Sequence, residues 1–530
     1  MPTDCVSYQE SGYFSSLVVD YLNEKKDLQS LYHRFPKIDH FKAQIEEKNS
    51  NFNSNNQRDV LAESLQKQYQ NFVISEATAA NISLLTNNKT FTITTGHQLN
   101  LFTGPLYFLY KIISTINLCK ELKIAYPNYN FVPVYWMATE DHDFEEINHF
   151  HFKGKKIAWN NDTKGPVGRL STKGLNEVFN HFSNELGSSE HANELKKIFE
   201  ESYLQHSNLA EATRFLANKL FGEHGLIIID GDDKSLKSLF TKIISDELLS
   251  QNSFVNVNQT NEHLKGYNIQ VNPREINLFY IEDNLRERII FEDNKYKINN
   301  TNLSFTQTEI IDLVTSSPEK FSPNVILRPL YQEVILPNLA YIGGGGEIAY
   351  WLELKSNFDY HQITFPILLI RNSVLIASEK QNKKIDKLSL SWQDLFLNQQ
   401  ALHNKKTREL SSFTIDFSEQ KLHLKKQFEH LQNMTLQTDK SFTGAVKAQE
   451  AKQTKGLENL EKRLLKAEKR IHKDALEHII NLQNELFPRK SLQERNVNFS
   501  EFYMEYGTTL IDKLVAELKP LEQEFKVIIM

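Results

Sequence analysis

Cysteine is scarce in this chain of 530 residues, which contains only Cys5 and Cys119. Two thiols cannot build a disulfide framework or supply the four ligands of a structural zinc site. A chain of this length can bury a core large enough to fold without either device. We therefore expect the cytoplasm, a reducing compartment, as its location. Cys119 lies within a helical pattern, where we expect it to pack as a small apolar side chain.

Long apolar runs are also absent. Nowhere do about 18 apolar residues follow one another without interruption, as a membrane-spanning helix requires. The start, MPTDCVSYQESGYF, lacks the basic segment and the apolar stretch of a secretory signal. The formal net charge is −6, with 61 basic against 67 acidic residues, so no overall basic field favours nucleic acid. We expect small-molecule chemistry, with neither nucleic acid nor a membrane as a partner.

Short apolar runs that end abruptly in polar or glycine-containing segments are typical of strands buried on both faces. The runs are FTITT (91–95), FVPVYWMA (131–138), LIIID (226–230) and FPILLIRNSV (365–374). Amphipathic helical patterns alternate with them, one of them directly after Gly104-Pro105. This alternation predicts an α/β fold with a doubly wound, mostly parallel sheet, whose ligand site lies beyond the carboxyl ends of the strands.

The composition changes along the chain and divides it into four parts. After Glu379 glycine and proline almost disappear until Pro488, and Lys, Glu, Gln and Leu dominate, which is typical of long helices. Alternating pieces at 267–272 and 276–282 predict small antiparallel additions to the core. The predicted parts are an N-terminal helical segment that packs on the core (1–90), the core itself (91–378) with insertions at about 150–210 and 251–320, a long-helix domain (379–500) and a tail that returns to the core as a helix and an edge strand (501–530).

The long-helix domain carries an apolar seam with the spacing of a coiled coil. Its members are Leu457, Leu460, Leu464, Ala467, Ile471, Ala475, Ile479, Leu482 and Leu486. An earlier seam through Leu424, Phe428 and Leu431 can pack back on it as an antiparallel coiled coil, or it can mate with a second copy of the chain.

The segment TTGHQLNLFTGP (94–105) leads from a strand into a helix. Backbone N–H groups and the imidazole of His97 at a helix N-terminus favour phosphate. In the alternative, His97 and Gln98 only satisfy buried backbone groups. The segment is neither a P-loop nor a GxGxxG fingerprint, because the residues that these motifs require are missing.

The densest group of titratable side chains follows the second apolar run, at Glu140, Asp141, His142 and Asp143. Such a group can perform acid/base work, or bind Mg²⁺ or a substrate amine. Its alternative is a solvated acidic loop. The spacing of His142 and His149 matches no standard zinc pattern, so we predict no metal-ligand set.

Four glycines, Gly343 to Gly346, precede a second helical pattern that begins IAYWLELK. Glycine allows close approach of the backbone to a ligand, but a hinge or lid needs the same residues. Arg328 can clamp a carboxylate or phosphate, or it can pair with Glu333. Arg371 and Asn372 follow a buried run and either reach the site or close it.

Five motifs in this order resemble the cysteine ligase family of bacillithiol biosynthesis, the BshC family, over essentially the whole chain. The motifs are TTGHQLNLFTGPLYFLYK, PVYWMATEDHDFEEINH, LRPLYQEVILPNLAYIGGGGEIAYWLELK, FPILLIRNS and LFPRKSLQERNVNF. The resemblance implies a Rossmann-like core related to nucleotidyl-transferring enzymes, inserted connecting segments and a C-terminal coiled coil that forms a homodimer. It also implies the addition of L-cysteine to glucosaminyl malate, the last step in making bacillithiol.

Amide formation from a carboxylate and an amine is uphill in water, so we expect ATP to activate the carboxylate, with Mg²⁺ as a further candidate. We assign catalysis to Glu140, Asp141, His142 and Asp143, with His142 as the proton acceptor. We assign the nucleotide phosphates to Gly96, His97, Gln98, Gly343, Gly344, Gly345, Gly346 and Glu347. We assign substrate binding to Asn100, Arg328, Tyr341, Arg371 and Asn372. The alternatives are another nucleotidyltransferase or a metal-dependent amidohydrolase on the same scaffold, and a nucleotide-binding assembly protein without catalysis.

Overall fold

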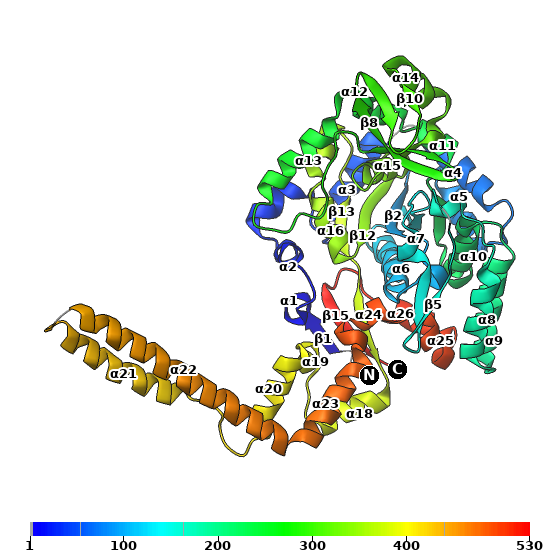
Figure 1. Ribbon diagram of the computed structural model, residues 1–530. Helices are drawn as coiled ribbons and strands as arrows, with labels where there is room; N and C mark the ends of the chain where they lie inside the picture. The colour runs from blue at the N-terminus through cyan, green and yellow to red at the C-terminus, as the bar shows by residue number, and fades with distance from the viewer. Residues whose placement is uncertain (1–3, 53–54, 163, 439) are drawn as a thin grey trace.

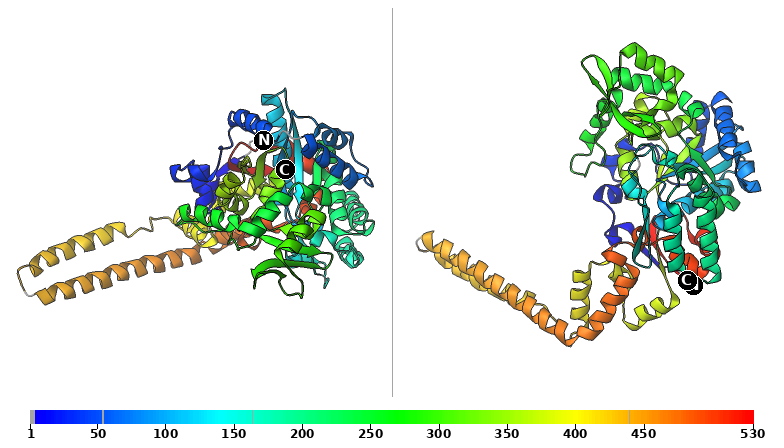
Figure 2. Two further views of the ribbon diagram at one scale, coloured as in Figure 1. Left: turned by 90° about the horizontal axis from the view of Figure 1, so that it is seen from above. Right: turned by 45° about the vertical axis from the view of Figure 1, so that its right-hand side comes forward.

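The computed structural model of the protein has a body of sheets and helices from which a helical arm extends (Figure 1), and two further views show the same arrangement (Figure 2). The structure describes residues 4–52, 55–162, 164–438 and 440–530. Over these residues, no helix is both long and apolar enough to cross a membrane.

Five parallel strands form the central sheet, in the order β13-β12-β2-β3-β6. They are β2 (Thr90–His97), β3 (Asn130–Met137), β6 (Ile227–Asp230), β12 (Asn338–Gly343) and β13 (Ile367–Ile370). Numbered along the chain the spatial order is 5-4-1-2-3, so the order of connection reverses between β2 and β12. This is the doubly wound arrangement of a Rossmann-like domain, which confirms the predicted fold class.

Helix α6 (Tyr107–Ala125) packs along β2 and β3. Its residues from Phe108 to Cys119 are buried without a break, so its apolar pattern follows from burial on every side. The turn before it contains Gly104 at φ +64°, where a Cβ would come within 2.7 Å of the Asn100 side chain. Only glycine fits there, because both the backbone angle and the space exclude a side chain.

The run 365–374 does not form one strand. Its first part is β13, and after Arg371 and Asn372 the chain enters a different sheet as β14 (Ser373–Ala377). There the C-terminal strand β15 (Glu524–Ile529) lies between β14 and β1 (Asp4–Ser7), which brings the two chain ends together (Figure 1). The expectation of an edge strand at the C-terminus was therefore wrong, because the N-terminal residues cover its other side.

Both insertions contain regular structure. The first holds the hairpin of β4 (His149–Phe152) and β5 (Lys155–Ala158), followed by α8 (Leu175–Leu186) and α9 (Glu190–Phe199). The second contributes to a five-stranded antiparallel sheet in the order β10-β9-β8-β7-β11. Its strands are β7 (Leu278–Glu282), β8 (Leu285–Glu292), β9 (Lys295–Ile298), β10 (Ser304–Phe305) and β11 (Phe321–Pro323). The piece 267–272 is not one of these strands.

The arm is an antiparallel pair of α21 (Ser418–Thr435) and α22 (Lys440–Ile471), as Figures 1 and 2 show. The chain bends at His472, so α23 (Lys473–Leu486) does not continue α22. Within the predicted seam, Ile479, Leu482 and Leu486 are buried, whereas Leu460 and Ile471 are 53% and 70% exposed. In the predicted earlier seam Phe428 is buried and Leu431 is 39% exposed, and Val446 and Leu465 are the other buried apolar residues of α21 and α22 in the described ranges. The homodimer stays a prediction.

A buried ion pair joins the end of the core to the C-terminal part of the chain. Arg371 donates to both carboxylate oxygens of Glu494, at 2.7 and 3.0 Å, and the two side chains are 4% and 1% exposed. A bidentate pair in this geometry compensates the cost of burying two charges only while both partners are present.

We predict that Glu494→Gln lowers the free energy of unfolding by about 3–5 kcal/mol, because Arg371 keeps a buried charge without its partner. The matched control is Glu485→Gln, which breaks the exposed pair with Lys384 and should cost less than about 1 kcal/mol. Urea unfolding followed by circular dichroism measures both. Equal losses in the two variants would show that the buried pair does not hold these parts together.

Candidate active site

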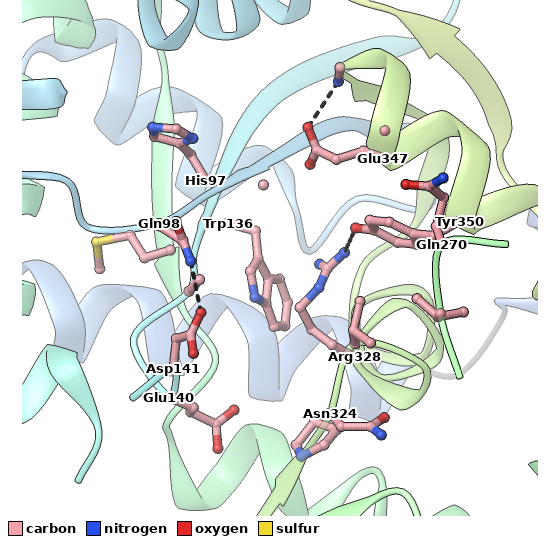
Figure 3. Close-up of a pocket in the computed structure, with 18 of the residues that line it drawn as sticks. His97, Gln98, Trp136, Glu140, Asp141, Gln270, Asn324, Arg328, Glu347 and Tyr350 are labelled. Atoms are coloured by element: carbon pink, nitrogen blue, oxygen red, sulfur yellow. Dashed lines mark hydrogen bonds between the residues drawn. The ribbon is translucent and has the colours of Figure 1, made fainter. Parts of the chain in front are cut away.

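The main cavity opens where β2, β3 and β12 end, at the point where the sheet order reverses (Figure 3). Its volume is about 830 Å³. The inserted antiparallel sheet contributes residues of β7 and β8 to its wall, and helix α24 (Gln493–Asn496) contributes Arg495. Doubly wound sheets bind their ligands at this reversal, so the cavity is the candidate active site.

The structure brings most of the predicted site residues to this cavity. Those that line it are Gly96, His97, Gln98, Glu140, Asp141, Arg328, Tyr341, Gly344, Gly345, Gly346, Glu347 and Arg371. Those that do not are Asn100, His142, Asp143, Gly343 and Asn372. Asn100 lines a smaller cavity of about 290 Å³, which shares Gln98, Tyr107 and Arg495 with the first.

An ion pair joins Lys111 of α6, which is 4% exposed, to Glu347 of α16 (Gly345–Leu352), which is 24% exposed, and both residues line the cavity. Lys111 also donates to the carbonyl oxygen of Gly96 at 2.7 Å. Glu347 accepts from the Gly344 N–H at 2.9 Å and from the Tyr341 hydroxyl at 2.7 Å. Although burial alone raises the pKa of Glu347, Lys111 and these donors hold it below its usual range. The carboxylate therefore organises the loop and is not free to bind another cation.

The four-glycine loop uses its glycines for space. None of Gly343 to Gly346 has a positive φ, so no backbone conformation there demands glycine. A Cβ on Gly346 would meet nothing within 4 Å, and Gly344 to Gly346 line the cavity. The backbone at the start of α16 is thus open to a ligand.

His97 is packed between aromatic rings, with centroids 5.4 Å from Tyr107 and 5.1 Å from Phe108. Burial, and then the charges of Lys111 and Arg371, hold the pKa of His97 well below its usual range. Its ring is neutral at pH 7, and its buried Nε2 has no hydrogen-bond partner among the residues that the structure describes. A neutral ring offers a phosphate no charge.

The acidic group after β3 separates into different surroundings. Glu140 forms a hydrogen-bonded ion pair of 2.5 Å with the buried Lys237 of α11 (Lys234–Ser238). Asp141 faces the cavity and accepts from the Gln98 amide at 3.0 Å, as Figure 3 shows. Burial alone raises the pKa of Asp141, but the Gln98 amide and Arg286 hold it below its usual range. Asp143 is exposed at the start of a short helix.

His142 lies outside the cavity wall and accepts a hydrogen bond at Nδ1 from Arg286, at 2.6 Å. Burial, and then Arg286, lower the pKa of His142. A neutral ring that accepts at Nδ1 carries its proton on Nε2, so neither nitrogen is left with a free lone pair. The geometry fits a residue that orients Arg286 better than one that accepts a proton.

Arg328 has no carboxylate within ion-pair distance among the residues described. Glu333, its alternative partner, instead pairs with Lys48 at 3.2 Å. Arg328 donates to Gln332 at 3.0 Å and to the Tyr350 hydroxyl at 3.3 Å. Figure 3 shows it beside Trp136, with its guanidinium toward Tyr350. This guanidinium is therefore available to an anion.

Arg371 lines the cavity, whereas Asn372 does not. Arg371 is committed to Glu494, and Asn372 is fully buried, where it bonds to Ser114 and to the Lys519 carbonyl oxygen.

Several lining residues carry charge or rings that the sequence analysis did not select. They are Tyr107, Lys111, Trp136, Arg274, Phe279, Arg286, Arg288, Tyr350 and Arg495. The alternation of arginine in LRERIIF (285–291) was a usable signal, since residues two apart on a strand share a face. Lys111 is the last residue of the motif TTGHQLNLFTGPLYFLYK, and Arg495 lies within LFPRKSLQERNVNF.

The lining of the cavity carries seven lysine and arginine side chains against three carboxylates, in a protein whose net charge is −6. A cleft lined by one sign of charge concentrates ligands of the other sign. The cavity is therefore suited to anions.

No group of three or more His, Cys, Asp or Glu side chains in the described ranges is arranged to hold a metal ion. Glu140 and Glu347 are engaged by lysines, whereas the Asp141 side chain is 32% exposed. Mg²⁺ commonly binds through one or two carboxylates together with substrate phosphates. Asp141 is the carboxylate that fits such an ion.

The fold and the cavity define a Rossmann-type protein with a basic cavity at the reversal of the sheet. Residues 1–372 match the family described as "Bacillithiol biosynthesis BshC, N-terminal Rossmann-like domain", and residues 374–530 match "Bacillithiol biosynthesis BshC, C-terminal coiled-coil domain". The chain belongs to the BshC family.

Curated relatives match along their whole length. The chain is 67% identical over 528 residues to a protein of Flavobacterium psychrophilum, covering 100% of this chain and 99% of the relative. It is 64% identical over 528 residues to one of Flavobacterium johnsoniae, covering 100% of both. It is 56% identical over 534 residues to one of Christiangramia forsetii, covering 100% and 99%. All three carry the name "Putative cysteine ligase BshC".

Glu353 anchors one wall of the cavity. Its buried carboxylate accepts from the backbone N–H groups of Gln270 at 2.7 Å and Val271 at 3.1 Å, and both of these residues line the cavity. Burial raises the pKa of Glu353 to about 7.

We predict that Glu353 makes folding less favourable as the pH rises from the usual carboxyl range to about 7. Between these values the folded state binds more protons than the unfolded state, so stability falls with rising pH. Urea unfolding at several pH values measures the free energy of unfolding of each protein. Over this interval wild type should lose stability relative to Glu353→Gln. Wild type and the exposed control Glu485→Gln should instead change in parallel. Parallel curves for wild type and Glu353→Gln would contradict the assignment.

Proposed function

We propose that this chain is the ligase that joins L-cysteine to glucosaminyl malate and so forms bacillithiol in the cytoplasm. The observation that carries the proposal is the excess of basic side chains in a cavity at the reversal of a Rossmann-type sheet. The family description and the names of the relatives support a cysteine-adding ligase of bacillithiol biosynthesis.

The proposed reaction takes ATP as a second substrate. Transfer of AMP to the cysteine carboxylate releases pyrophosphate, after which the glucosamine amine attacks the carbonyl carbon, the amide forms, and AMP and a proton leave. Transfer of the terminal phosphoryl group is the other route and gives ADP and then phosphate. Both routes place several negative charges beside the reacting carboxylate.

The residues that fit the phosphates lie on both sides of the sheet reversal. Gly344 to Gly346 present open backbone at the start of α16, and Gly96 to Gln98 end β2 opposite them. Arg328 adds a guanidinium without a carboxylate partner among the described residues. The cavity volume of about 830 Å³ lies within the range of small-molecule sites.

Asp141 fits the amino group of a substrate. It is the most exposed of the three carboxylates that line the cavity, and Gln98 and Arg286 keep it ionised. An ionised carboxylate can orient an ammonium group and so align the donor for attack.

The test of the proposed function is a mass-spectrometric assay of the purified protein with ATP, Mg²⁺, L-cysteine and glucosaminyl malate. We expect bacillithiol together with an equal amount of AMP, or of ADP if the phosphoryl route is used. Tight nucleotide binding without any turnover would overturn the proposal and favour a nucleotide-binding assembly protein.

We predict that Gly346→Ala weakens ATP binding by about tenfold or more, because a methyl group takes the space where the phosphates approach the backbone. Its Cβ has room in the free protein, so stability should not fall. Gly456→Ala, on the exposed arm and equally free of clashes, is the matched control. Equal ATP affinity of the two variants in equilibrium binding would place the phosphates elsewhere.

A further inference from the structure

Strand β8 of the inserted sheet presents two arginines to the cavity. Arg286 and Arg288 are two residues apart, so they share one face of the strand, and both line the cavity. Glu287 between them belongs to the opposite face, where it accepts from Asn300 at 3.2 Å. Of these three charged side chains, the two basic ones line the cavity and that of Glu287 lies on the other face.

Arg286 is held in place before any ligand arrives. Its guanidinium stacks over Phe279, 4.1 Å from the ring centroid, and its Nε donates to the Ser322 hydroxyl at 3.2 Å. One Nη donates to Nδ1 of His142 at 2.6 Å. The side chain is only 8% exposed, and its nearest carboxylate, Asp141, is 3.9 Å away. A buried guanidinium fixed in this way is preorganised for an anion.

The side chain of Arg288 has neither a hydrogen bond nor an ion pair to any residue in the described part of the chain, although the residue is half-buried and its carbonyl oxygen accepts from the Asn299 N–H at 2.9 Å. It stands opposite Phe279 in the ladder between β7 and β8. The backbone positions of two residues that are two apart on a strand are separated by about 7 Å. At this spacing the two guanidiniums can each take one carboxylate of a short dicarboxylate chain.

We propose that Arg286 and Arg288 bind the two carboxylates of the malyl group of the acceptor substrate. This inference rests on the proposed function and extends it by assigning acceptor recognition to the inserted sheet. Guanidinium groups bind carboxylates through paired N–H donors, so each arginine can take one carboxylate. The nucleotide remains with the glycine loops and Arg328, and the acceptor lies against the insertion.

His142 is then a positioning residue that acts through Arg286. Its Nδ1 accepts one Nη hydrogen and directs the rest of the guanidinium. Loss of the ring should weaken acceptor binding and leave the chemical step nearly intact. A proton acceptor would behave in the opposite way, with a large fall in kcat and little change in KM.

The first experiment compares KM values of the full-length protein for glucosaminyl malate, L-cysteine and ATP. We expect Arg288→Gln to raise KM for glucosaminyl malate about tenfold or more and to change the other two less than about twofold. Arg288→Lys keeps the positive charge but loses the paired N–H donors, so its KM for glucosaminyl malate should lie between those of wild type and Arg288→Gln. Glu287→Gln, on the other face of the strand, is the matched control. An unchanged KM for glucosaminyl malate in a folded Arg288→Gln protein would overturn the proposal.

His142→Ala should raise the same KM with kcat nearly unchanged, and His142→Gln, whose amide oxygen can accept from Arg286, should restore it in part. A collapse of kcat in both variants would instead make His142 a catalytic residue.

A binding measurement separates this inference from the proposed function. Calorimetric titration with L-malate needs no turnover, and we expect binding to wild type that weakens about tenfold or more in Arg288→Gln. Loss of malate binding in the variant supports the inference even if the protein makes no bacillithiol. Bacillithiol formation without malate binding by wild type would overturn the inference and leave the proposed function standing.

Discussion

The ion pair between Lys111 and Glu347 is the interaction on which the site depends. The two residues come from the helices that follow β2 and β12, the strands between which the sheet order reverses. Lys111 also donates to the Gly96 carbonyl oxygen, and Glu347 also accepts from the Gly344 N–H. The pair therefore positions both the loop after β2 and the loop after β12. Because Lys111 is only 4% exposed, loss of Glu347 would leave a buried cation without its partner. Together with burial, which has the larger effect, the charge of Lys111 lowers the pKa of His97.

The rest of the chain completes this crevice. The central sheet supplies the strand ends and the backbone N–H groups, which are common features of Rossmann-type folds. The inserted sheet adds Arg286 and Arg288, and the C-terminal domain adds Arg495 next to the buried pair of Arg371 and Glu494. Positive charge is thereby gathered from three separate parts of an acidic protein. In the proposed site, the added parts recognise the ligand and the sheet determines where it lies.

The sequence predicted β2, β3 and β6 to within one or two residues, because fully buried strands and their abrupt polar ends are local features. It missed β12, since NLAYIG runs directly into the four glycines and reads as part of their loop. Pairings could not be predicted: Glu140 meets Lys237 and Arg371 meets Glu494, across 97 and 123 residues. The same limit applies to the arm, where the register of α21 determines that Leu465 is buried and Leu460 exposed.

The most direct test of the account is an experimental structure of the protein with a non-hydrolysable ATP analogue and glucosaminyl malate. We expect the phosphates between the β2 and β12 loops, beside Gly346 and Arg328, and the malyl carboxylates at Arg286 and Arg288. Both ligands would then meet above the Lys111–Glu347 pair. Nucleotide bound away from the strand ends, for example against the arm, would contradict the claim that the sheet reversal is the reaction site.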